Sequence, residues 1–201
     1  MKPSAAPRPS AAGRAPSPKT TSGNEAGCEW LVLTYQLPEK PTSLRAVVRR
    51  KLSAAGAVYL SPACAAAPLT GSAERVMRRM RATITDAGGS AVLLTGRALA
   101  GEPDLAGAYN AARGVDYADI VAGCRDAVAG LEALTAAGEF RYQPLWDGDI
   151  GLRRLSVRYR AVRDQDRFSA GHAEAAAAAL DSYRSVLEEY ASRVYATDSR
   201  S

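Results

Sequence analysis

Within residues 30–99 the spacing of apolar residues alternates between that of strands and that of helices, and this order constrains the fold more than any other feature. Short apolar runs bounded by Pro, Gly or Ser predict strands at 30–37, 57–60, 63–67 and 91–94. Segments with apolar residues three and four apart predict helices at 44–55 and 72–87. The predicted order is therefore strand, helix, strand, strand, helix, strand.

This order allows both helices to pack on one face of a four-stranded antiparallel sheet. The expected class is therefore α+β, with a ferredoxin-like βαββαβ sandwich over 28–100 followed by a helical C-terminal half over 101–196. The third strand is the weakest element, because 63–67 is mostly alanine, which is a poor strand former. The second sheet face would remain an apolar patch unless the helical half or a second subunit covered it.

Amphipathic segments fill the second half of the chain. Pro103 is placed in the first turn of a helix, Gly114 predicts a kink or break, and helical spacing then continues to Leu134. The Gly and Pro content of 138–150 predicts a loop. A shorter helix is expected next, with an inward side formed by Leu152, Leu155, Tyr159 and Val162.

The last predicted helix, at about 170–195, has apolar residues in alternating steps of four and three: Ala176, Leu180, Tyr183, Leu187, Tyr190 and Val194. Such a seam lies along a partner helix. The favoured partner is the helix at 115–135 of the same chain. The alternative partner is a second subunit, with an oligomer seam formed by Leu180, Tyr183, Leu187 and Tyr190.

Composition limits the remaining segments. Residues 1–27 are rich in Pro, Ala, Ser and Gly and carry net +3 of the chain's +5, so they are expected to be a disordered basic tail; the end at 197–201 is also expected to be disordered. The tail lacks the apolar core of a signal peptide, and the chain has no run of about 18 apolar residues. We expect a cytoplasmic protein without a membrane partner.

Three widely spaced cysteines and a single histidine, His172, do not have the spacing of a disulfide framework or a zinc site. Two acidic residues, Asp147 and Asp149, lack a neighbouring His or Cys that would complete a metal set. The first strand also ends without the metal-binding aspartate of ferredoxin-like nucleases. We therefore expect no metal, no cofactor and no catalytic residue, and the chain is predicted not to be an enzyme.

Arginines are concentrated on the sides of the two sheet-half helices that face away from the core. The candidate binding residues are Arg45, Arg49, Arg50, Arg75, Arg78 and Arg79, with Arg81 beside them. A guanidinium donates two hydrogen bonds to an oxyanion, so the DNA backbone and a small oxyanion are both candidate ligands. The alternative is a solvated helix face with no ligand. Without a helix-turn-helix pattern, base-specific recognition is not predicted.

A second basic stretch runs from Arg153 to Arg167. Acidic residues lie close to it in the sequence: Asp147, Asp149, Asp164 and Asp166. A structural network of salt bridges is therefore favoured over a ligand site.

Several segments resemble one known family in their order and spacing: Trp30–Pro38, Leu44–Leu52, Gly56–Leu60, Gly88–Ala91, Asp116–Tyr117, Arg163–Phe168 and Leu187–Tyr195. Over about residues 29–196 the chain resembles the N-terminal domain of the chromate-resistance regulator ChrB family. The resemblance implies a cytoplasmic bacterial protein that represses or senses within a chromate-response operon. Longer members carry a second, C-terminal domain, so the chain is expected to correspond to the N-terminal module alone.

Two functions from different classes follow from these observations. The first is a DNA-associated regulator that binds the DNA backbone, chromate or another oxyanion through its arginine-rich helices. The alternative is a non-catalytic assembly protein that forms a homodimer or larger oligomer through the sheet face or the last helix.

Overall fold

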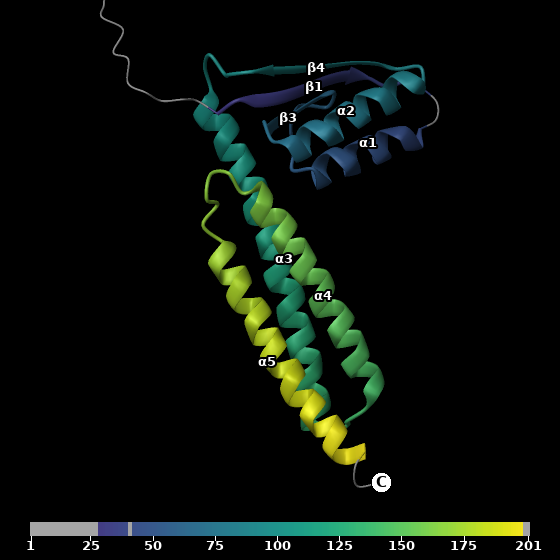
Figure 1. Ribbon diagram of the computed structural model, residues 1–201, viewed down its shortest axis with the longest axis vertical. Coiled ribbons are helices and arrows are strands. Elements are labelled where there is room, and N and C mark those ends of the chain that lie inside the picture. The colour runs from purple at the N-terminus through teal and green to yellow at the C-terminus, as the bar shows by residue number, and fades with distance from the viewer. Residues whose placement is uncertain (1–27, 40–41, 199–201) are drawn as a thin grey trace, which may run out of the picture.

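The structure, a computed structural model, describes residues 28–39 and 42–198. The predicted tail at 1–27 and the last three residues lie outside the described part. The elements are β1 (Trp30–Gln36), α1 (Ser43–Ala54), β2 (Val58–Ser61), β3 (Cys64–Pro68), α2 (Gly71–Asp86), β4 (Ser90–Gly96), α3 (Glu102–Ala136), α4 (Tyr142–Gln165) and α5 (Ala173–Asp198). Figure 1 shows the sheet and its two helices at one end and the three long helices extending away from them. The predicted α+β class is confirmed.

The strands form one antiparallel sheet in the order β2-β3-β1-β4, so β2 and β4 are its edges. β3 forms despite its alanines because it pairs on both sides, with Ala65 opposite Leu33 of β1 and Tyr59 of β2. Pairing in the centre of the sheet therefore outweighs the low strand propensity of alanine.

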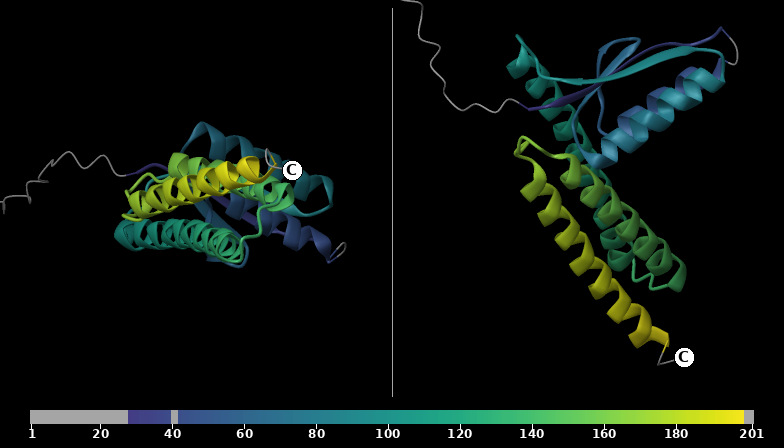
Figure 2. Two further views of the ribbon diagram at one scale, coloured as in Figure 1. Left: turned by 90° about the horizontal axis from the view of Figure 1, so that it is seen from below. Right: turned by 45° about the horizontal axis from the view of Figure 1, so that its top comes forward.

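α1 and α2 cover one face of this sheet, as Figures 1 and 2 show. Alternate residues of β1, Leu31 and Leu33, are fully buried on that face. The helices contribute four further fully buried members of this core, Val48, Leu52, Met77 and Ile84. The prediction that both helices share one face is confirmed.

Gly88 and Gly89 end α2 and turn the chain into β4. Gly88 has a φ of +84°, in the left-handed region that favours glycine. A Cβ on Gly89 would lie 2.5 Å from the carbonyl oxygen of Gln36. Only glycine therefore lets the start of β4 lie against the end of β1.

The helices α3, α4 and α5 form an elongated bundle, which differs from the sequence predictions in two places. Gly114 does not break α3, because the buried side chains of Arg113 and Tyr117 on either side hold the helix in place. The predicted loop at 138–150 is helical from Tyr142 onwards. Pro144 is compatible with this helix because it lies in the first turn, where its missing N–H would have no intrahelical partner.

The core of the bundle contains the seam of α5, which packs against α3 and α4 of the same chain. The partner helix favoured from the sequence is thus correct. α5 continues to Asp198, two residues beyond the predicted end of the helical region at 196. Among the described residues no helix combines the length and the apolar character needed to cross a membrane.

The bundle joins the sheet through the N-terminal part of α3 and the loop after α4. Trp30 of β1 stacks on Phe168 with ring centroids 5.9 Å apart, and Tyr109 meets both rings edge-on. Arg113, only 3% exposed, donates hydrogen bonds to the carbonyl oxygen of Gly56 and to the side chain of Gln165. These contacts connect both halves of the chain.

The second sheet face is covered only in part. Trp30 and Val58 are buried there with Tyr109 of α3. Towards the edges, Leu60 of β2 and Val92 and Leu94 of β4 remain about half exposed. Part of the apolar patch expected from the sequence therefore stays open, as a groove lined by Val32, Leu60, Leu94 and Leu105.

Candidate functional site

Positive charge is concentrated on α1 and α2. α1 carries Arg45, Arg49, Arg50 and Lys51, and α2 carries Arg75, Arg78, Arg79 and Arg81 against Glu74 and Asp86. The two helices together therefore hold net +6, more than the chain's total of +5, and the rest of the chain is net −1. Charge is thus strongly segregated even though the chain as a whole is only mildly basic.

On α1, Arg45 and Arg49 lie one turn apart on the side towards the β2 edge. The Arg49 guanidinium carbon is 5.3 Å from the centroid of the Tyr59 ring of β2. Burial and the neighbouring Tyr35 raise the pKa of Tyr59 well above its usual value, although Arg49 lowers it. Arg49 therefore covers a neutral tyrosine and contributes to packing as well as to surface charge.

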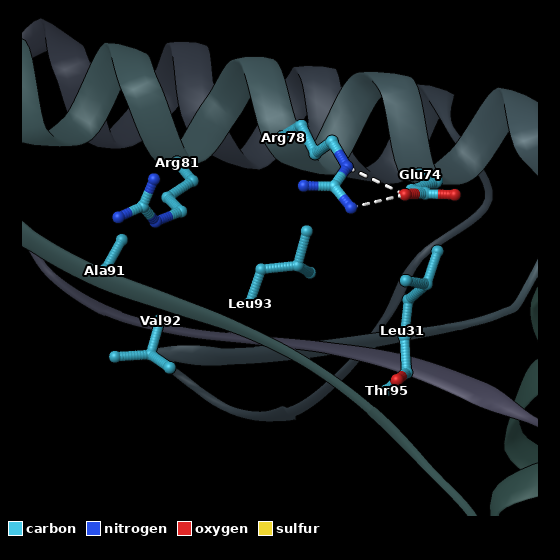
Figure 3. A pocket seen from close by; sticks show the side chains of 8 residues that line it. All are labelled: Leu31, Glu74, Arg78, Arg81, Ala91, Val92, Leu93 and Thr95. Carbon is cyan, nitrogen blue, oxygen red and sulfur yellow. Dashed lines mark hydrogen bonds and ion pairs between the residues drawn. The ribbon is translucent and has the colours of Figure 1, made fainter.

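On α2, Arg78 and Arg81 lie at the opposite edge of the sheet, where they line a groove between this helix and β4 (Figure 3). Arg78 donates to Glu74 through Nε at 2.7 Å and pairs with it through Nη2 at 2.6 Å. Arg81 extends over Ala91 without a carboxylate within 4.0 Å among the described residues. The groove measures about 500 Å³, a size typical of small-ligand sites.

Between the two edges, Arg50, Arg75 and Arg79 are exposed on the outer surface of the helix pair. Arg75 lies nine residues before the buried Ile84, about 180° around the helix, and therefore points away from the sheet. Arg50 lies two residues, about 200°, from the buried Val48. These side chains face solvent rather than a cavity.

The six predicted arginines are thus spread over three sides of one helix pair instead of converging on a point. In the described part of the chain only Arg78 of the six has a carboxylate within 4.0 Å. Six carboxylates of the described helical half form ion pairs, and all of these pairs are with arginines of that half: Asp116, Asp119, Glu139, Asp149, Asp181 and Glu189. Five of the six guanidinium groups are therefore available to an anion from solution.

A sequence model of the family described as "Protein ChrB, N-terminal" matches residues 45–201. This match includes nearly all of α1 and every later element. The chain belongs to the ChrB N-terminal domain family. This family is linked to chromate resistance. Neither the curated proteins nor the solved structures contain a match.

Family membership confirms the resemblance drawn from the sequence, with one difference in extent. The resemblance began at about residue 29, whereas the match begins at Arg45, so the segment Trp30–Pro38, which contains β1, lies outside it. All six predicted arginines lie inside the ChrB match.

The other predicted interface residues of this ChrB-family chain are core residues of the bundle. Leu180, Tyr183, Leu187 and Tyr190 are between 1% and 7% exposed. They pack against α3 and α4 of the same chain. A second chain could contact them only if the bundle opened.

The basic stretch of α4 forms fewer internal pairs than expected. Arg153 pairs with Asp149 at 3.0 Å, and Arg158 reaches Asp119 of α3 at 2.8 Å. Asp166 accepts hydrogen bonds from the Tyr117 hydroxyl and the Ala170 amide instead of pairing with arginine. No group of three or more His, Cys, Asp or Glu residues suited to a metal ion occurs in residues 28–39 and 42–198.

Two features of the site were not predicted from the sequence. The Glu74–Arg78 pair has the i,i+4 spacing of a helical ion pair, and that spacing could have identified it. The contact of Arg49 with Tyr59 joins two different elements, and no local pattern in the sequence indicates it.

Proposed function

We propose that this ChrB-family chain binds the phosphate backbone of duplex DNA through the arginines of α1 and α2. The observation that carries the proposal is that five of the six predicted arginines have no carboxylate partner among the described residues. Unpaired guanidinium groups keep their full hydrogen-bonding capacity for phosphate oxygens.

The spread of these arginines favours a polyanion over a single small ion. An extended backbone presents one charge about every 1.7 Å of duplex, so it engages groups distributed over a convex surface. Contacts of this type supply affinity and position rather than sequence specificity.

Within this proposal the chain is a cytoplasmic bacterial regulator of a chromate response that acts by binding and not by catalysis. Its link to chromate resistance comes from the family. We also infer a ferredoxin-like topology for residues 28–100. The strand order β2-β3-β1-β4, with helices after β1 and β3, supports that assignment.

Fluorescence anisotropy tests the proposal, with a DNA duplex taken from the region upstream of the gene that encodes this chain. The variant Arg45→Ala/Arg50→Ala/Arg75→Ala/Arg79→Ala removes four exposed charges without touching the core. It should weaken binding at low salt at least tenfold and reduce the slope of log K against log salt by about 3 to 4. A matched control, Arg184→Ala, removes an exposed arginine of α5 that already pairs with Asp181 and should leave binding nearly unchanged. Equal binding by the wild type and the quadruple variant would contradict the proposal.

The groove between α2 and β4 favours a second candidate function, the binding of a small oxyanion such as chromate. Arg78 and Arg81 provide two positive charges there, but Glu74 neutralises one of them. Titration calorimetry with chromate, and with sulfate as the isosteric control, tests this candidate. Arg81→Ala should abolish binding, whereas Glu74→Gln should strengthen it by releasing Arg78. An unchanged affinity in both variants would exclude the groove as the oxyanion site.

A further inference from the structure

The outer side of α4 exposes four large apolar side chains to solvent. Tyr142, Trp146, Ile150 and Val157 are between 49% and 65% exposed. Their spacing of four, four and seven residues places them in one line along the helix, here called the α4 stripe. Part of this stripe, from Trp146 to Val157, lines a continuous shallow hollow together with Arg153 and Arg154.

The α4 stripe lies opposite the side of α4 that packs in the bundle. Leu155 is nine residues after Trp146, about 180° around the helix, and it belongs to the buried core. α4 is therefore apolar on two opposite sides. At the N-terminal end of the stripe, Tyr142 contacts Tyr195 and Asp198 of α5, whereas the described residues of this chain leave Trp146, Ile150 and Val157 about half exposed or more. A contiguous exposed row of this kind marks an interaction surface.

Charges beside the stripe are divided between its two ends. Its N-terminal end is flanked by Asp147 and Asp149, whereas its C-terminal end is flanked by Arg153, Arg154 and Arg160. Asp147 and Arg154 are seven residues apart and so lie on the same flank of the helix. The helix surface is therefore complementary to itself when a second copy is turned end to end.

We propose that α4 pairs with α4 of a second copy of this chain in an antiparallel arrangement around a two-fold axis beside Ile150. In this pairing Ile150 packs near its own symmetry mate. Asp147 of each copy lies opposite Arg154 of the other, because these positions are about equally far from the axis. Trp146 lies beside the arginines of the other copy, where a cation–π contact forms.

Charge decides the direction of the pairing. A parallel pair would place Asp147 beside Asp147 and Arg154 beside Arg154, and like charges in contact are unfavourable. The antiparallel pair converts both contacts into attractive ones. The proposal is independent of DNA binding, because the arginines of α1 and α2 take no part in it.

Sedimentation velocity on the full chain tests the self-association. The wild type should show a concentration-dependent monomer–dimer equilibrium. Ile150→Asp should raise the dissociation constant of the dimer at least tenfold, because it places two carboxylates near the axis. Val115→Asp is the matched control: Val115 is 62% exposed on α3, away from the stripe, so this change should have no effect.

A charge exchange tests the register. Asp147→Arg should weaken the dimer because it faces Arg154, and Arg154→Asp should weaken it for the same reason. The double variant should recover most of the affinity, since the ion pair is restored with its partners exchanged. Additive losses in the double variant would overturn the antiparallel register.

Oxidative cross-linking provides a readout that does not depend on affinity. In a Cys28→Ser/Cys64→Ser background, Ile150→Cys should form a covalent dimer, because the two thiols meet near the axis. Val157→Cys should not, because the two copies of this residue lie about 20 Å apart in an antiparallel pair. A wild type that remains monomeric up to 100 times the concentration used for DNA binding, or a dimer that tolerates Ile150→Asp, would overturn the proposal.

Discussion

The Tyr183 hydroxyl of α5 donates a hydrogen bond of 2.8 Å to the carbonyl oxygen of Gly148, which lies within α4. Tyr183 reaches this backbone because two glycines of α4 leave room for it. A Cβ on Gly151 would lie 2.9 Å from the Tyr183 hydroxyl oxygen, and a Cβ on Gly148 would lie 2.6 Å from Cδ1 of Leu187. The glycines therefore set the close approach of the two helices.

Gly151→Ala should lower the free energy of unfolding by up to about 2 kcal/mol. Forcing a methyl group against the tyrosine costs about 1–3 kcal/mol, while the gain in helix propensity returns about 1 kcal/mol. Gly130→Ala in α3 is the matched control, because nothing lies within 4 Å of its Cβ. It should stabilise the chain by about 1 kcal/mol. Urea titration measures both, and a stabilising Gly151→Ala would contradict the packing described.

The Arg113 side chain is 4% exposed and pairs at 2.9 Å with Asp116, which is 30% exposed. Arg113→Leu should lower the free energy of unfolding by about 1–3 kcal/mol, the cost of leaving buried acceptors without a donor. The change leaves Gln165 and the carbonyl oxygen of Gly56 without their donor. Asp116 retains Arg158 at 3.5 Å, so its charge is still partly compensated. Chemical denaturation measures the loss. Arg125→Leu, at an exposed position of the same helix, should change stability by less than about 0.5 kcal/mol.

Stability should fall as the pH rises from about 10 to about 12. Burial and the nearby Asp166 carboxylate raise the pKa of Tyr117 to about 12, whereas a tyrosine in the unfolded chain has a pKa of about 10. In this window the folded state retains a proton on Tyr117 that the unfolded state has lost, so Tyr117 alone lowers the stability by up to about 1.4 kcal/mol per pH unit, and Tyr59, whose pKa is also raised, adds to the decline. Tyr117→Phe should make the curve measured by thermal melting less steep. An equally steep decline in that variant would assign the effect to other groups.

Arg49→Ala and Arg45→Ala should differ in stability although both remove a charge from the same side of α1. Only Arg49 lies over an aromatic ring, that of Tyr59, and such contacts contribute about 0.5–1 kcal/mol at exposed sites. Thermal denaturation should therefore show a loss of that size for Arg49→Ala and almost none for Arg45→Ala. Equal stabilities would mean that the ring contact contributes nothing.

The faces of the elements could be predicted from the sequence because they depend on local spacing. Alternation in β1 places Leu31 and Leu33 on the helix-covered face, and helical spacing in α5 places Tyr183 and Tyr190 in the bundle. Gly88–Gly89 marked the end of α2 for a similar local reason, since few residues other than glycine adopt the positive φ angle of Gly88. The family resemblance also followed from this order of elements.

The first turns of α4 could not be predicted in the same way. The glycines and Pro144 within 138–150 resemble the composition of a loop, yet Gly148 and Gly151 are contact points for Tyr183 and Leu187 of another helix. Their role becomes visible only when α5 lies beside them.

The sequence by itself determined the buried faces of β1, α1, α2 and α5, which helices carry the arginines, and where the sheet half ends. Only the tertiary structure decided that Arg49 and Arg78 lie at opposite edges of the sheet. The physical reason is that a periodic pattern specifies the rotation of a residue about its own helix axis. The neighbour on its outer side, whether Tyr59, the β4 groove or open solvent, depends on the order of strands that are distant in the sequence.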